Sequence, residues 1–146
     1  MSTIPQDLNW VKARAACTIG AIFSALHRDA EEDVSEANAL NMVQFTGYAA
    51  PALAVATNGR GNHFVVHEQG NVETAVKFTL RQDRILINFG SEQLVITITL
   101  SDDGRCKLRV NDELQSYEQW QVRRRVLESL FFGNGRSLPS TPQIGR

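Results

Sequence analysis

The chain has 146 residues, of which 42% are hydrophobic and 21% charged, a composition that favours one globular domain with its own core over a disordered chain. The formal net charge is -1, and this balance argues against a dedicated nucleic-acid-binding protein, which usually carries a strong basic excess.

The N-terminal residues carry neither the basic region nor the apolar run of a secretory signal peptide. Apolar stretches elsewhere are broken by polar residues well before the ~20 residues that a membrane-spanning helix requires. We therefore expect a cytoplasmic protein that does not bind membranes.

A first helix is predicted over residues 5–29. Apolar residues recur there at helical spacing and form one narrow stripe, the predicted core face: Ile4, Leu8, Val11, Ala15, Ile19, Ile22 and Leu26. Trp10 and Arg14 lie on a second stripe, well away from this face. A large aromatic residue off the core face is typical of an interface, so Trp10 and Arg14 are candidate partner contacts. Trp10 could equally pack under residues 48–62.

Acidic residues follow this helix at five positions: Asp29, Glu31, Glu32, Asp33 and Glu36. Asp33 and Glu36 have the spacing of a capping box, which predicts a second helix over residues 33–45 that stops at Gly47. The same carboxylates could bind a hard cation, but they lack the ligand spacing of a calcium-binding loop. Capping and solvation explain them with fewer assumptions.

Strands are predicted by period-two alternation of apolar and polar residues, clearest over residues 72–80. Further strands are expected over residues 63–68, 84–89, 94–100 and 106–110, and residues 53–57 could form a sixth. The connections are short throughout, which predicts an antiparallel meander with one buried face.

The last helix is predicted over residues 116–132, with Ser116 and Gln119 as a capping box and Gly133 as the C-terminal cap. Residues 134–146 are polar and rich in Gly, Ser and Pro, so we expect a disordered tail after a single domain of residues 1–133.

The predicted fold class is therefore α+β, with element order α-α-β-α and a single-layer antiparallel sheet of five or six strands. The N-terminal and C-terminal helices would cover the apolar face of the sheet. In outline this layout is similar to type III secretion chaperones and to frataxin-like domains; the likeness is one of architecture, without a motif of either family.

Cysteine and histidine do not form a recognisable site in the sequence. Cys17 and Cys106 are far apart and fit two thiols in a reducing cytosol, although a single bridge stays open. His63 and His67 would lie roughly 13 Å apart along a strand, too far to share one metal ion. We expect no metal, no cofactor and no catalytic constellation.

Arg123 and Arg124 form the least expected feature of the last helix. At 100° per residue both fall inside the arc that holds Trp120, Leu127 and Phe131. A guanidinium beside a core face needs a partner or a route to water, for example an ion pair of Arg124 with the residue four positions on. The alternative is that both arginines bind an anionic ligand or an acidic partner peptide.

Our leading functional hypothesis is a non-enzymatic protein-binding module, chaperone-like or an adaptor, that forms a homodimer and binds another protein. The candidate contacts are Trp10, Arg14, Arg123 and Arg124. The alternative is a pocket for a small anionic ligand, possibly enzymatic, between the sheet and the C-terminal helix. A third, weaker hypothesis is metal binding by the acidic run, as the outline likeness to frataxin-like domains implies.

Overall fold

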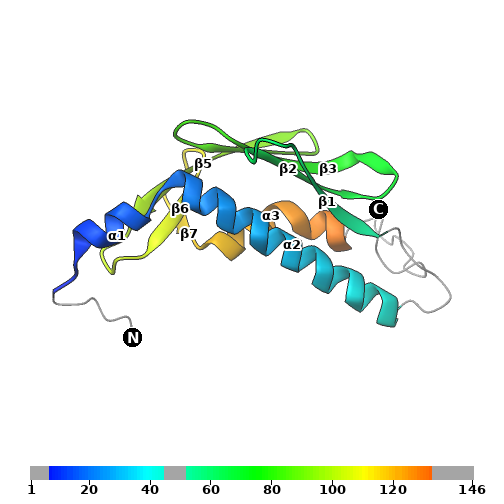
Figure 1. The fold of residues 1–146 in the computed structure, drawn as a ribbon, viewed down its shortest axis with the longest axis horizontal. Coiled ribbons are helices and arrows are strands. Elements are labelled where there is room, and N and C mark those ends of the chain that lie inside the picture. Colours follow the sequence, from blue (N-terminus) through cyan, green and yellow to red (C-terminus); the bar gives the residue numbers. More distant parts are fainter. Residues whose placement is uncertain (1–6, 45–51, 133–146) are drawn as a thin grey trace.

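The computed structural model describes residues 7–44 and 52–132 as three helices and one seven-stranded antiparallel sheet. Helices α2 and α3 lie on one face of the sheet, while the short helix α1 extends from the left end of the molecule (Figure 1). The predicted α+β class and α-α-β-α order are confirmed.

The sheet is a simple meander in which each strand pairs with the next along the chain. Its strands are β1 Leu53–Thr57, β2 His63–Glu68, β3 Asn71–Leu80, β4 Ile85–Phe89, β5 Glu92–Leu100, β6 Cys106–Val110 and β7 Ser116–Tyr117. The open question about residues 53–57 is thereby answered, since they form the edge strand β1. The extra strand, β7, uses two residues that we expected at the start of the last helix.

The buried face of the sheet follows from the alternation in the sequence and from the strand register. Phe64 stands opposite Phe78, and Phe78 stands opposite Ile87, so large apolar side chains line up across three strands. The rings of Phe64 and Phe78 stack with their centroids 4.3 Å apart. All three residues are almost fully buried and belong to the core that α2 and α3 cover.

The N-terminal helix is shorter than predicted, because the chain breaks between α1 (Trp10–Ala16) and α2 (Ile19–Gln44). The hydroxyl Oγ1 of Thr18 accepts a hydrogen bond from the backbone N–H of Ala21 at 3.1 Å, so Thr18 caps a new helix. The part of the predicted core stripe in α1 is wrong: α1 has no buried residue, and Val11 is exposed.

A disulfide between Cys17 and Cys106 ties the break between α1 and α2 to strand β6, with the two Cα atoms 5.3 Å apart. The sequence allowed a single bridge but did not predict one. The two cysteines are 89 residues apart, so no local pattern could reveal the bridge. The expectation of two reduced thiols is wrong for this structure.

Helix α2 also absorbs the second predicted helix, because the chain stays helical through the acidic residues. Asp33 therefore lies in mid-helix and caps nothing, while the predicted stop at Gly47 lies outside the described residues. The core face of α2 includes Phe23, Leu26, Ala30, Val34 and Ala37. In the ranges that the structure describes, no helix is long and apolar enough to cross a membrane.

Helix α3 begins later than predicted and spans Gln119–Phe132. The predicted capping box at Ser116 and Gln119 does not form; instead the backbone N–H of Glu118 donates to the side chain of Gln121 at 2.8 Å. The buried residues of α3 are Val122, Val126, Leu127 and Leu130. The predicted tail, residues 134–146, lies outside the described residues.

Candidate functional site: a groove between α2 and α3

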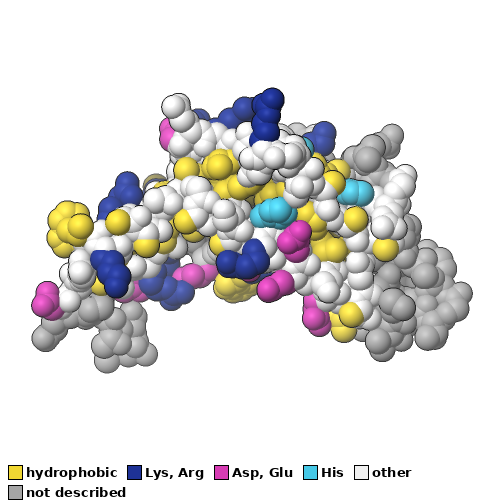
Figure 2. Space-filling view, viewed as in Figure 1, with side chains coloured by type: hydrophobic (Ala, Val, Ile, Leu, Met, Phe, Trp, Pro, Cys, Tyr) yellow, Lys and Arg dark blue, Asp and Glu magenta, His cyan; other side chains and the backbone are white. Residues whose placement is uncertain are grey.

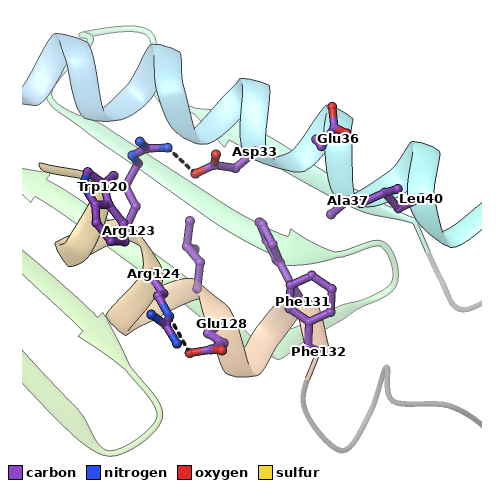
Figure 3. Close-up of a pocket in the computed structure, with 11 residues that line it drawn as sticks. Asp33, Glu36, Ala37, Leu40, Trp120, Arg123, Arg124, Glu128, Phe131 and Phe132 are labelled. Atoms are coloured by element: carbon purple, nitrogen blue, oxygen red, sulfur yellow. Dashed lines mark hydrogen bonds and ion pairs between the residues drawn. The ribbon is translucent and has the colours of Figure 1, made fainter.

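A groove of about 390 Å³ lies between α2 and α3 (Figure 3). Helix α2 contributes Asp33, Glu36, Ala37 and Leu40, and α3 contributes Trp120, Arg123, Arg124, Leu127, Glu128, Phe131 and Phe132. Its size is within the range of small-molecule sites, so volume alone does not identify its ligand.

Large apolar side chains gather at this groove although water can reach them. Leu40, Trp120 and Phe132 are all exposed, Trp120 by 52%. Phe131 contacts Phe132 edge-on, with the ring centroids 6.2 Å apart. Neighbouring exposed apolar groups that face a common hollow are typical of a protein-binding groove.

Arg123 lies at the inner wall of the groove and is only 16% exposed. Its Nη1 atom contacts Asp33 Oδ2 at 2.6 Å and donates to the backbone oxygen of Asp29 at 3.5 Å (Figure 3). The Arg123–Asp33 pair joins α3 to α2 directly. Residue Asp33 thus has a structural role that the sequence did not suggest.

The predicted orientation of α3 differs from the observed one, because the core face is centred on Val122, Val126 and Leu130 rather than on Trp120. Trp120 sits at the rim of that face, and this rotation turns it toward the groove. Arg123 is thereby on the core side and Arg124 on the solvent side.

Arg124 is 65% exposed and forms the ion pair that we predicted: its Nε atom lies 3.3 Å from Glu128 Oε1, four residues on. Each arginine in the groove therefore already faces a carboxylate. The space between α3 and the sheet is filled by core residues, so the described structure has its groove beside α3 rather than beneath it. Both facts weigh against an anion-binding pocket between the sheet and α3.

The α2 side of the groove is acidic: Glu36 lines it, and Glu32 lies one turn before Glu36, within the electrostatic influence of Arg28. Glu32 and Glu36 are exposed, lie four residues apart on one face of the helix, and form no salt bridge with a described residue. Two like charges at this spacing repel each other by a few tenths of a kcal/mol. A cation placed beside them would relieve this repulsion.

Trp10 and Arg14 lie on α1, at the other end of the molecule from the groove (Figure 1). Trp10 is 65% exposed, and hydrophobic side chains stand out over α1 at the left end of Figure 2. The structure thus gathers Arg123 and Arg124 at one place and Trp10 and Arg14 at another. The groove residues of α2, Ala37 and Leu40, belong to the apolar pattern of the second predicted helix but were not predicted as site residues; Ala37 is part of the core face, and Leu40 is exposed three residues on.

Two of the histidines make contacts within the fold. His27 lies inside α2 and stacks on Phe64, with ring centroids 4.7 Å apart. The Nδ1 atom of His67 contacts the backbone oxygen of Glu68 at 2.9 Å. Within residues 7–44 and 52–132, no three His, Cys, Asp or Glu side chains lie close enough together to hold a metal ion.

Comparison of the chain with protein-family models, with curated proteins and with solved structures finds no match in any of the three. The groove and the exposed helix α1 are therefore the features of the described structure that bear on function.

Proposed function

We propose that the protein is a non-enzymatic binding module that holds an amphipathic segment of another protein in the groove between α2 and α3. The segment would present apolar side chains to Leu40, Trp120 and Phe132 and basic side chains to the acidic edge of α2. The single observation that supports this most strongly is the groove itself, apolar and accessible to water, with both of its arginines already paired.

The charges around the groove favour an occupant with basic side chains. Because Asp33 and Glu128 are compensated by Arg123 and Arg124, Glu36 is the lining residue whose charge is left over. A segment with lysine or arginine along one edge would complement it and Glu32. Helix-in-groove recognition of this kind reads apolar anchors at positions i, i+3, i+4 and i+7.

A Trp10→Glu variant allows the groove to be observed directly. The chain has two tryptophans, so Trp120 becomes the only one in this variant. The probe is a synthetic helical peptide of about 14 residues, with leucines at i, i+3, i+4 and i+7 and lysines on the remaining positions. We expect the emission of Trp120 to shift to shorter wavelength on titration, with a micromolar dissociation constant, because the peptide buries its indole ring.

Two controls separate the groove from general attraction to acidic surface. Adding Leu40→Lys to the Trp10→Glu chain should abolish the shift, whereas adding Leu114→Lys should leave it intact, because Leu114 is 92% exposed and lies outside the groove. A peptide of the same composition in scrambled order should bind at least tenfold more weakly. Equal binding of both peptides, or to the Leu40→Lys chain, would refute the proposed function.

The cellular location is a separate matter. A cytoplasmic location stays a prediction from the N-terminal residues, and the Cys17–Cys106 bridge weighs against it, because disulfides persist mainly in oxidising compartments. The absence of nucleic-acid binding likewise stays a prediction from the net charge.

A further inference from the structure

Helix α1 is difficult to explain within one copy of the chain. It has seven residues and none of them is buried. Isolated helices shorter than about 12 residues are marginal in water, so α1 depends on contacts beyond its own turns. In the described structure its exposed face has none.

The exposed face of α1 combines apolar and basic side chains, whereas the groove combines apolar side chains with an acidic edge. Counting 100° per residue from Trp10, Arg14 lies at about 40°, Val11 at about 100° and Ala15 at about 140°, so the exposed surface of α1 spans both predicted stripes. Trp10, Val11 and Arg14 are exposed, and neither Lys12 nor Arg14 pairs with a described carboxylate. Helix α1 thus presents apolar side chains together with the basic residues Arg14 and Lys12, and its charge is complementary to an apolar groove with an acidic edge.

Helix α1, which we call the arm, is also held in a fixed position at both ends. At its start, Leu8 packs on Gly104: a Cβ atom at that glycine would lie 2.8 Å from Leu8 Cδ1. At its end, the disulfide anchors Cys17 to Cys106. Its conformational freedom is therefore already reduced, which lowers the entropy that docking would cost.

The arm cannot reach the groove of its own chain. From Ile19 to Asp33, the first groove residue of α2, the helix rises roughly 21 Å, whereas α1 is only about 10 Å long. Helix α1 also points away from α3 (Figure 1). A second copy is the occupant that the geometry allows.

We propose that two copies exchange their α1 arms, each arm seated in the groove between α2 and α3 of the other copy. Two α2 helices side by side and antiparallel bring each arm to the partner's acidic edge. If Arg14 of one copy lies near position 34 of the other, the two-fold axis passes roughly at residue 24. The surface of α2 there is made of small residues, Ala21, Ser24 and Ala25, which permits close approach.

This inference rests on the proposed function, since it assigns the resting occupant of the same groove. Figure 2 shows, on one face of the molecule, hydrophobic side chains over α1 and acidic side chains over the middle of α2. In the dimer the arm occupies the groove until a target segment of similar chemistry replaces it. The dimer thereby keeps the apolar side chains of both grooves covered.

The test uses full-length chains and two variants, Trp10→Glu in the arm and Leu40→Lys in the groove. Wild type should sediment as a dimer at tens of micromolar, and each variant alone as a monomer. Mixed in equal amounts, the two variants should form a heterodimer, because an intact arm then meets an intact groove. As a control, Leu114→Lys in an otherwise wild-type chain should leave the dimer unchanged.

Arm exchange and a direct contact between two copies of α1 give different results. A symmetric Trp10–Trp10 contact would leave the mixture of variants monomeric, as would a groove used only by another protein, and either result overturns the proposal. Amide hydrogen exchange checks the folded state: α1 should be protected in wild type and at least tenfold less so in Trp10→Glu, with α2 and the sheet unchanged.

The two proposals fail separately. If wild type is a monomer and its groove still binds the lysine–leucine peptide, the arm exchange is refuted and the binding function is retained. If wild type is a dimer and the two variants complement each other, but the Trp10→Glu chain does not bind the peptide, the arm exchange is retained and the binding function is refuted.

Discussion

At the scale of single residues, Glu113 is the most strongly perturbed acid described. The guanidinium of Arg125 donates two hydrogen bonds to its carboxylate, at 3.1 and 2.8 Å, and the hydroxyl of Tyr117 donates another. These donors, Arg125 first, lower the pKa of Glu113 from 4.5 to about 2. The contact fixes α3 against β7.

The lowered pKa predicts a pH dependence of stability. Because Glu113 stays ionised to lower pH in the folded chain than in the unfolded chain, its contribution is complete above about pH 4.5 and is lost as the pH falls toward 2. Glu113→Gln should therefore flatten the decline of the free energy of unfolding across this window, measured by urea denaturation. Identical pH profiles for both proteins would show that the carboxylate is not held in this way.

The two neighbouring arginines should differ when each is replaced by methionine. Arg123→Met leaves Asp33 unpaired between two helices and should cost about 1–2 kcal/mol, since Asp33 keeps some access to water. Arg124→Met breaks an exposed pair at helical spacing and should cost about 0.5 kcal/mol or less. Denaturant unfolding measures both, and equal losses would contradict the assigned positions.

The sequence predicted the ion-pair partner of Arg124 but not that of Arg123. Helical spacing predicted that Arg123 and Arg124 lie beside apolar groups, and it predicted the pairing of Arg124 with Glu128 because that contact is local. The partner of Arg123 is 90 residues away. Only the packing of α3 against α2 brings Asp33 to it, and no periodicity encodes that contact.

At the scale of elements, the disulfide should contribute strongly to stability. The bridge closes a loop across an 89-residue separation, and restricting the unfolded chain over such a loop is worth about 4–5 kcal/mol in the chain-entropy treatment. The double variant Cys17→Ser, Cys106→Ser should unfold at lower urea concentration than wild type. Reduced wild type should match it, and alkylation of both thiols in native, unreduced protein would contradict the bridge.

Element boundaries show where period and packing compete. The 3.6-residue period continues across residues 17 and 18, so it predicted one helix where the chain forms α1 and α2. The signal available was Thr18, a good N-cap residue, and its meaning depended on Cys17 being drawn to the sheet. Similarly, Ser116 resembles a cap, but pairing of Arg109 with Ser116 in the sheet prevails over it.

At the scale of the whole molecule, alternation was enough to predict the meander, because each strand has a buried and a wet face and short connections. The groove was beyond reach, since it exists only where two helices distant in sequence lie side by side on the sheet. Trp10 and the aromatic end of α3 could be recognised as surplus apolar surface from sequence. The proposed fit of α1 into the groove rests on the positions of both in the structure.

The most direct measurement is sedimentation of wild type during titration with the lysine–leucine peptide. We predict that a species of twice the 16.2 kDa chain mass gives way to a peptide-bound monomer, because arm and peptide compete for one groove. The scrambled peptide should leave the dimer intact. A peptide that binds while the dimer persists unchanged would contradict the shared groove.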